Sequence, residues 1–311
     1  MHEICRSRFA SLFLATACLV GGPGRALAQQ TPPTNPPPVE QRVTDVAKGV
    51  HVLTGTLNNT TVVVGSDAII VIDNQFAPRY GAIMEKIRTL SGKPIRYVVN
   101  THYHYDHTGG NAQFRRQGVD IVAHANAVAR LIDPPPDPFS GLPNAPTPPA
   151  GLPNLPYSGA GTTLSIGGVT AELVHPAPAH TDGDTVVILK EVNVIAAGDI
   201  VGNHYPNIDL AVGGGIDGTI AAVDVILGRM DDRTKLVPGH GPVLGRAEVV
   251  AFHNMLKTAR ERIVRAKAGG MSEAQVVEAR LLADLDDPWR SDGPGRPSSD
   301  RFPGAVYRSL P

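Results

Sequence analysis

The densest group of chemically capable side chains is the segment 101–107, Thr-His-Tyr-His-Tyr-Asp-His. It places three imidazoles and one carboxylate within six residues, a density that structural roles explain poorly. Side chains at alternate positions of an extended segment share a face, so His102 and His104 could hold one metal ion while a turn directs Asp106 and His107 towards a second. Nitrogen and oxygen ligands of this kind suit zinc, and iron or manganese could also be held. The segment therefore predicts a metal centre.

Sulfur is not expected among the metal ligands. Both cysteines, Cys5 and Cys18, lie in an N-terminal segment with early arginines, an apolar run and small residues at a cleavage site, which together indicate an export signal. We expect residues 1–28 to be removed as a signal peptide and the mature chain to be exported, periplasmic or secreted. The apolar run falls short of the about 20 residues that span a membrane, so no span is expected. Lipidation at Cys18 is an alternative, disfavoured because Ala15 stands where a large aliphatic residue is usual.

The elements around the histidines are predicted to hold them in a loop between a strand and a helix. Residues 95–100 read as a short apolar strand, and the next helix is expected to begin near Gly110. An amphipathic helix is expected before that strand, over residues 78–90, where apolar residues recur at the spacing of one helical face. The metal-binding side chains would therefore lie beyond the end of a buried strand.

The rest of the chain repeats an order of strands followed by helices. Turn residues separate three β-rich runs at 51–57, 60–64 and 68–72, which predicts an antiparallel meander. In the second half a long amphipathic helix is expected over 246–268, and a capping box at Ser272 should begin a last helix. Residues 119–132 are expected to form a strand followed by a short helix. Other strands are expected at 162–166, 169–174, 185–189, 192–197 and 235–237, and another helix at 219–227. Two such halves predict an α/β (α+β) fold, a four-layer αββα sandwich.

Composition divides the chain after the signal into three segments. Residues 29–45 are a Pro-rich tether, because proline lacks an amide donor and favours extended conformations. Residues 46–285 form the folded domain. Inside it, residues 133–156 contain ten prolines, so no core element is expected there, and the segment is either a lid over the site or a solvated insert. Residues 286–311 are rich in Pro, Gly and Ser and are expected to be a tail that is ordered only in part.

Composition and charge favour a globular enzyme that acts on a small molecule. The chain has 311 residues, of which 42% are hydrophobic, enough for a well-buried core. Its formal net charge is −1 and its basic residues are scattered, so it lacks the basic patch that a nucleic-acid partner would require. Oligomeric state cannot be inferred from these features.

The His-x-His-x-Asp-His order of the cluster resembles the signature of the metallo-β-lactamase superfamily. Similar family motifs follow in the expected order at 178–184, 197–199 and 237–241, and the resemblance covers about residues 46–245. It implies the αββα fold, two zinc ions per chain and a carboxylate, Asp199, that bridges them. The metal ligands that it implies are His102, His104, Asp106, His107, His180, Asp199 and His240.

Several residues near these motifs are candidates for contact with substrate or for orienting a ligand, on weaker evidence than the motifs themselves. Asn203, His204 and Tyr205 follow the Asp199 motif and are candidates for contact with substrate. Asp73 ends a strand, where an aspartate in this family would orient a ligating histidine, although a plain turn residue is an equal alternative. Of the other histidines, His175 lies close enough in sequence to His180 to approach the pocket, whereas structural or surface roles are expected for His51, His124 and His253.

The resemblance implies a hydrolase in which a hydroxide shared by two zinc ions attacks an amide or ester carbonyl. Zinc lowers the pKa of water from about 15.7 to about 7, so no protein nucleophile is needed. Asp106, the predicted catalytic residue, would bind metal and also orient the hydroxide or move a proton.

The sequence leaves the substrate open. An aspartate at 199 differs from the β-lactamases that place a cysteine there, and the ligand set is more similar to glyoxalase II and lactonases. Export argues against a cytosolic glutathione thioester, and a complete second metal site argues against a persulfide dioxygenase. Because exported members of the superfamily include weak β-lactamases, β-lactam hydrolysis is the first hypothesis, followed by lactone or other ester hydrolysis. A periplasmic zinc-binding accessory protein without rapid turnover is the alternative from another class.

Overall fold

The computed structural model describes residues 40–55, 58–136, 141–290 and 301–311. The expected signal peptide and residues 29–39 of the expected tether lie outside the described residues. The described residues belong to one compact unit, which spans Pro36–Pro311.

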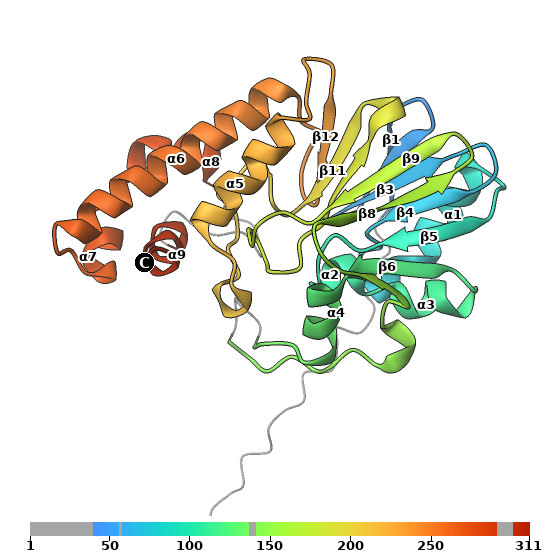
Figure 1. Cartoon of the computed structure of the whole chain (residues 1–311), viewed down its shortest axis with the longest axis horizontal. Helices are drawn as coiled ribbons and strands as arrows, with labels where there is room; N and C mark the ends of the chain where they lie inside the picture. The colour runs from blue at the N-terminus through green and yellow to red at the C-terminus, as the bar shows by residue number, and fades with distance from the viewer. Residues whose placement is uncertain (1–39, 56–57, 137–140, 291–300) are drawn as a thin grey trace, which may run out of the picture. The chain divides into compact units, whose positions relative to one another are not determined.

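Two β-sheets form the centre of this unit (Figure 1). The first contains, in spatial order, β1 (Arg42–Ala47), β2 (Val50–Thr54), β3 (Asn59–Val64), β4 (Ile69–Ile72), β5 (Ile95–Val99), β6 (Asp120–His124) and β7 (Leu155–Tyr157). Strands β1 to β4 are antiparallel, and β4 to β7 are parallel. The second contains β12 (Lys235–Pro238), β11 (Val194–Gly198), β10 (Val186–Leu189), β9 (Val169–Val174) and β8 (Gly161–Ile166), of which only the pair β11 and β12 is parallel.

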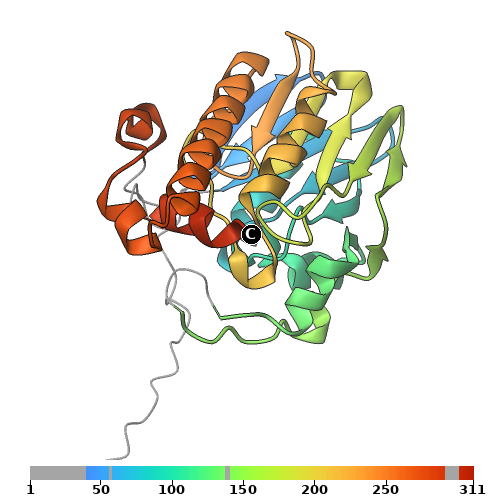
Figure 2. The ribbon, with the colours of Figure 1, turned by 60° about the vertical axis from the view of Figure 1, so that its left-hand side comes forward.

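Helices cover the outer face of each sheet (Figure 2). The helices are α1 (Tyr80–Leu90), α2 (Tyr105–Thr108), α3 (Asn111–Arg116), α4 (Ala125–Ile132), α5 (Ile216–Leu227), α6 (Arg246–Ala268), α7 (Glu273–Glu278), α8 (Asp286–Trp289) and α9 (Arg301–Ser309). Helices α1 and α3 pack on the first sheet, and α5 and α6 on the second, so the predicted αββα sandwich is confirmed.

Strand alternation explains the layers. In β4, Ile70 and Ile72 join the core between the sheets, whereas Ile69 and Val71 join the core beneath α1 and α3. Successive side chains of a strand point to opposite faces, and a strand covered on both faces is apolar throughout. The same division recurs in β10, where alternate residues enter the central core and the core beneath α5 and α6. The unbroken apolar runs in the sequence are thus strands buried on both sides.

The structure differs most from the sequence-based boundaries at β1, at β7 and at the C-terminus. Strand β1 begins at Arg42, inside the expected tether, and pairs with β2. Strand β7 lies at the end of the Pro-rich insert, where proline is tolerated because β7 is the edge of its sheet. The C-terminal segment was expected to be a partly ordered tail, but it contains α9, whose Phe302 and Val306 are fully buried. This helix packs on α6 and α7 and completes the core of the second half.

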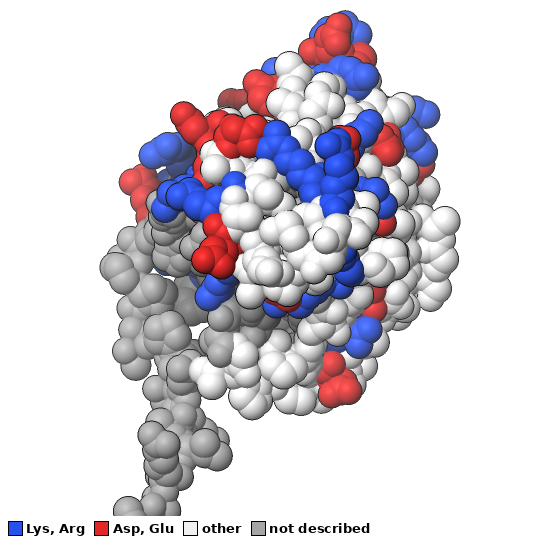
Figure 3. All heavy atoms as spheres, turned by 90° about the vertical axis from the view of Figure 1, so that its left-hand side faces the viewer, with Lys and Arg blue, Asp and Glu red and all other residues white. Residues whose placement is uncertain are grey.

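Surface charges support this C-terminal packing only weakly. On the face shown in Figure 3, basic and acidic side chains are interspersed, without a large area of one sign. Arg308 of α9 pairs with Glu273 of α7 at 2.9 Å, and Arg260 of α6 pairs with Asp217 of α5. Exposed pairs of this kind contribute about 0–1 kcal/mol each, so burial of apolar residues must provide most of the stability. No helix in the described part of the chain has both the length and the apolar character needed to cross a membrane.

Candidate metal centre

Loops at one edge of the two sheets carry the predicted ligands. The segment with the histidine cluster follows β5, and His180 lies in the loop that joins β9 to β10. Asp199 follows β11 and His240 follows β12. Because β11 and β12 are parallel, their carboxyl ends bring Asp199 and His240 to the same place. Four loops separated in sequence therefore converge on one site, as is usual where strands end in such folds.

The first metal group consists of His102, His104, His180 and Asp199. Nδ1 of His104 lies 3.1 Å from Nε2 of His102 and 3.0 Å from Nε2 of His180. Oδ2 of Asp199 lies 4.0 Å from Nε2 of His102 and 3.8 Å from Nε2 of His180. Three nitrogens and one oxygen thus face a common centre.

The second metal group consists of Asp106, His107 and His240. Nε2 of His107 lies 3.3 Å from Nε2 of His240 and 3.5 Å from Oδ2 of Asp106. Nε2 of His240 lies 3.2 Å from the same Oδ2 of Asp106. Asp106 and His107 lie in α2, a single helical turn that follows His104 and redirects these two side chains away from the first group.

Asp199 lies between the two groups. Its Oδ1 is 3.4 Å from Nε2 of His107, and its Oδ2 is 3.3 Å from Nε2 of His240. The same carboxylate also belongs to the first group. One residue therefore contacts donor atoms of both groups, as a ligand shared by two ions would.

The donor set fits zinc. Ligands 2.0–2.1 Å from a tetrahedral zinc ion are about 3.3 Å from one another, close to the separations within both groups. Oδ1 of Asp199 is buried and has no hydrogen-bond partner among the described residues, which suits a cation ligand. A hard carboxylate combined with imidazoles would also accept iron or manganese.

Gly239 allows the β12 loop to approach the other ligands. A Cβ atom at this position would fall 2.0 Å from Oδ1 of Asp199 and 2.8 Å from Cε1 of His107. Any other residue at this position would collide with the side chains of Asp199 and His107, so glycine is sterically required before His240.

Residues 53–245, well over half of the chain, match the metallo-beta-lactamase superfamily. The protein belongs to this superfamily.

Individual relatives of this superfamily member are distant. The 2,4-dinitroanisole O-demethylase subunit alpha of Nocardioides sp. (strain JS1661) is 28% identical over 171 residues, which cover 53% of this chain and 45% of that subunit. Metallo-beta-lactamase type 2 of Bacillus cereus is 22% identical over 205 residues, 64% of this chain and 73% of that protein. The solved structure of the metallo-beta-lactamase from Pontibacter korlensis has a TM-score of 0.58 at 20% identity and covers 70% of this chain and 99% of its own. This chain thus spans less than half of the demethylase subunit, and the structural likeness shows the fold.

Electrostatics in the superfamily site couple the ligands strongly. Burial opposes ionisation of Asp106 and Asp199, but neighbouring histidines outweigh it and hold the pKa of both carboxyls well below the usual range. Burial and the neighbouring imidazoles lower the pKa of His102. For His240, burial is outweighed by Asp199 and Asp106, which raise its pKa to about 10, and Asp106 similarly raises the pKa of His107. A metal ion bound by these two rings would have to displace protons from them.

Asp73 lies directly behind His107. The Oδ2 atom of Asp73 is 2.8 Å from Nδ1 of His107, and the carboxylate also accepts hydrogen bonds from the backbone N–H and hydroxyl of Thr101. Asp73 is 3% exposed and has a φ of 56°, in the left-handed region. This contact holds the ring of His107 with Nε2 towards the second metal group, as the orienting role expected of Asp73 would require.

Asp209 supports the first group and was missed in the sequence. Its Oδ2 is 3.1 Å from Nε2 of His104 and accepts a hydrogen bond from the hydroxyl of Tyr103. Burial opposes ionisation of Asp209, but these two hydrogen bonds outweigh it and lower its pKa. The contact turns Nδ1 of His104 towards the first group. Asp209 lies in a loop without a recognisable pattern, ten residues after Asp199, so only the folded chain reveals it.

The three residues proposed to contact substrate have different environments. Asn203 is exposed and close to the His240 loop, because a Cβ on Gly241 would lie 2.7 Å from its Oδ1. His204 is partly buried, with Nδ1 2.8 Å from the carbonyl oxygen of Tyr205. The prediction for Tyr205 is wrong, because its side chain is 0% exposed and stacks on Phe302 at 4.7 Å between ring centroids. Tyr205 is a core residue that anchors the loop after Asp199.

The remaining histidines lie outside the two metal groups. His51 pairs with Asp45 at 2.6 Å, and His253 with Asp224 at 3.1 Å. His124 accepts a hydrogen bond from the first turn of α4 and stacks on His175 at 3.6 Å between centroids. His51, His124 and His253 thus have the structural contacts expected of them, and His175 contacts His124 instead of a metal group.

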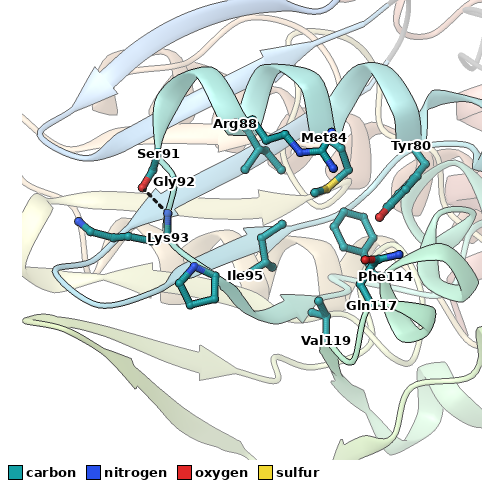
Figure 4. A pocket seen from close by; sticks show the side chains of 12 residues that line it. Tyr80, Met84, Arg88, Ser91, Gly92, Lys93, Ile95, Phe114, Gln117 and Val119 are labelled. Carbon is teal, nitrogen blue, oxygen red and sulfur yellow. Dashed lines mark hydrogen bonds between the residues drawn. The ribbon is translucent and has the colours of Figure 1, made fainter.

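A separate surface pocket of about 300 Å³ lies between α1, β5 and α3 (Figure 4). Met84, Ile95 and Phe114 are among its lining residues, and Lys93 and Arg88 lie at its side. None of its lining residues belongs to either metal group. The pocket therefore plays no part in the site described here.

Proposed function

We propose that the protein is an exported zinc-dependent hydrolase with two metal ions, and that β-lactams are its first candidate substrates. The position of Asp199 carries this proposal, because its carboxylate contacts donors of both metal groups. Similarity to the metallo-beta-lactamase type 2 of Bacillus cereus supports the choice of substrate.

The seven predicted ligands would hold the metal ions. When bound, two zinc ions would lower the pKa of a water molecule and polarise the carbonyl oxygen under attack. The ionised carboxylate of Asp106 orients the water and accepts its proton, which then passes to the leaving nitrogen as the carbon–nitrogen bond breaks. Asp73 and Asp209 keep the rings of His107 and His104 turned towards the ions. No thiol or hydroxyl nucleophile of the chain is required.

The first test combines metal content with hydrolysis. The mature chain, beginning at Gln29, is purified, its metal is determined by elemental analysis, and cleavage of a chromogenic cephalosporin is followed with and without chelator. Two zinc ions per chain and chelator-sensitive cleavage would support the proposal. Two zinc ions without cleavage would redirect the search to lactones and other esters, and inactivity on all of these would favour a zinc-binding accessory protein. A chain that retains no metal would refute the proposal.

Asp106 offers a second test. Asp106→Asn keeps the shape of the side chain but removes the charge that accepts the proton, so we expect a large loss of turnover. Unchanged turnover with both ions present would contradict the role of Asp106. Export is tested separately, by sequencing the N-terminus of the protein recovered from the periplasm or medium, where Gln29 is the expected first residue.

A further inference from the structure

Two consecutive asparagines at the turn between β2 and β3 are buried beside the second metal group. Asn58 is 2% exposed and Asn59 is 3% exposed. A buried amide side chain is costly unless its donors and acceptor have partners. The partners of both side chains lead to ligands of the second group.

Asn58 holds the carboxylate of Asp106. Its Nδ2 donates to the backbone oxygen and to Oδ2 of Asp106, both at 2.7 Å. That Oδ2 is the atom that lies 3.2 Å from Nε2 of His240 and 3.5 Å from Nε2 of His107. The two hydrogen bonds fix both the main chain and the side-chain rotation of Asp106. Asn58 therefore determines where this ligand oxygen lies.

Asn59 holds the loop of His240. Its Nδ2 donates to the carbonyl oxygens of Pro238 and Gly241, both at 2.9 Å, and its backbone N–H donates to the carbonyl oxygen of Gly239 at 2.8 Å. The hydroxyl of Thr54 donates to its Oδ1 at 2.9 Å and orients the amide. Three hydrogen bonds thus hold the backbone on both sides of His240.

The first metal group has other supports. Nδ1 of His180 lies 2.8 Å from the carbonyl oxygen of Asn207, and Nε2 of His104 contacts Asp209. These residues belong to the loop after β11, which is remote in sequence from the β2–β3 turn. Asp73 reaches both groups, because the hydroxyl of Thr101 that donates to it also lies 3.1 Å from Nδ1 of His102. The side-chain hydrogen bonds described for Asn58 and Asn59, in contrast, lead to the second group alone.

We propose that the Asn58–Asn59 dipeptide positions the second metal group and sets the affinity for the second ion without changing that for the first. The inference rests on the proposed two-metal function, but it concerns metal binding and does not depend on the substrate. Removal of a residue that orients a metal ligand typically lowers metal affinity by about 10- to 100-fold. That range is the expected effect on the second ion.

The experiment isolates each group with a variant that disables the other. His180→Ala disables the first group, and His240→Ala the second, so each background should retain one zinc ion. Zinc affinity is measured by competition with a chromophoric chelator, without substrate. When Asn58→Leu or Asn59→Leu is added to His180→Ala, the affinity for the remaining zinc ion should fall by about 10- to 100-fold. Adding either change to His240→Ala should leave the affinity of its ion unchanged.

Asn154→Leu is the matched control. Asn154 is a partly buried asparagine just before β7, and its side chain makes two hydrogen bonds, with Ile121 and Asp120 at the start of β6, the end of that strand opposite the site. It should not change either affinity. The inference would be overturned if Asn58→Leu and Asn59→Leu lowered zinc affinity equally in both single-group backgrounds, or left it unchanged in the His180→Ala background. A wild-type chain that binds only one ion would also overturn it, whereas two-ion binding without hydrolysis would challenge the proposed function alone.

Discussion

The two metal groups lie side by side, yet most of their supporting residues come from different parts of the fold. Behind the second group are Asp73, which follows β4, and Asn58 and Asn59 at the turn into β3. All of these belong to the first sheet, whose strands are adjacent. Behind the first group are the carbonyl oxygen of Asn207 and the carboxylate of Asp209. Of these supports, Asp73 also reaches the first group, because the hydroxyl of Thr101 lies 3.1 Å from Nδ1 of His102. A mutation at one of the other supports can therefore damage one group selectively.

The support of the first group extends to the C-terminus. Tyr205, in the same loop as Asn207 and Asp209, stacks on Phe302 of α9. The backbone N–H of Tyr205 donates to the carbonyl oxygen of Trp289, and its hydroxyl donates to Asp286 at 3.2 Å. We therefore expect changes in the C-terminal helices to weaken metal binding at the first group more than at the second.

Asp199 should affect both metal groups, unlike the residues that support one of them. Asp199→Ala removes the carboxylate that contacts donors of both groups, so both ions should bind more weakly and turnover should fall by more than the roughly 100-fold upper value for a supporting residue. Elemental analysis and cephalosporin hydrolysis, measured on the same preparation, test this. If the variant retained both ions with unchanged affinity, Asp199 would not be shared between them.

Asp209 and Asp73 form a matched pair of variants that tests whether the two metal groups have different supports. Each is a buried aspartate behind one histidine, and each has further hydrogen bonds that Ala would leave unsatisfied. Asp209→Ala should lower the affinity for the first ion alone, by about 10- to 100-fold. Asp73→Ala should lower the affinity for the second ion by a similar factor and that for the first ion less, because Asp73 reaches His102 only through the hydroxyl of Thr101. Zinc competition in the single-group backgrounds measures both effects. The same loss of both ions in either variant would show that the groups share one scaffold.

Phe302 tests the link to the C-terminus. Phe302→Ala empties a fully buried site against Tyr205, which should lower the free energy of unfolding by about 3–5 kcal/mol and weaken the first ion more than the second. Urea unfolding and zinc competition measure the two effects. Phe114→Ala is the control, because Phe114 is equally buried in the core of the first sheet, beneath α1. If both variants weakened the two ions alike, general loss of stability would explain the result.

Most of the layered fold could be predicted because its signals are local. Helix α6 occupies the predicted residues 246–268, since apolar spacing and the following glycines define it, and the capping box at Ser272 is present. Short edge elements were harder. Strand β1 has a mixed burial pattern without clear alternation, and Pro156 hides β7. Helix α9 lies beyond a segment rich in Pro and Gly, and its burial depends on contacts with α6 and α7.

The residues of the candidate site also differ in how well the sequence predicts them. The candidate metal ligands are recognisable in the sequence because metal binding restricts the residue type and their motifs are compact. Supporting residues are not, because an asparagine before a strand or an aspartate in an irregular loop has many ordinary roles. Asn58 contacts a residue 48 positions away, and Asp209 one that is 105 away, so nothing near either residue in sequence predicts its partner. Tyr205 shows the opposite error, since its place after a motif suggested the pocket although its side chain faces the core.

Substitution of Asn203 should have the smallest effect of these variants and should leave the supports of both metal groups unchanged. Its side chain is exposed beside the His240 loop, so Asn203→Ala should change the free energy of unfolding by no more than about 0.5 kcal/mol and leave both zinc affinities intact. If Asn203 contacts substrate equally in the ground and transition states, KM should rise a few-fold while kcat stays constant. Steady-state kinetics on the best substrate measure this, with Asn254→Ala, an exposed asparagine on α6, as the control. A loss of the second ion in Asn203→Ala would instead make Asn203 a support of His240 and extend the scaffold of the second group into the loop after β11.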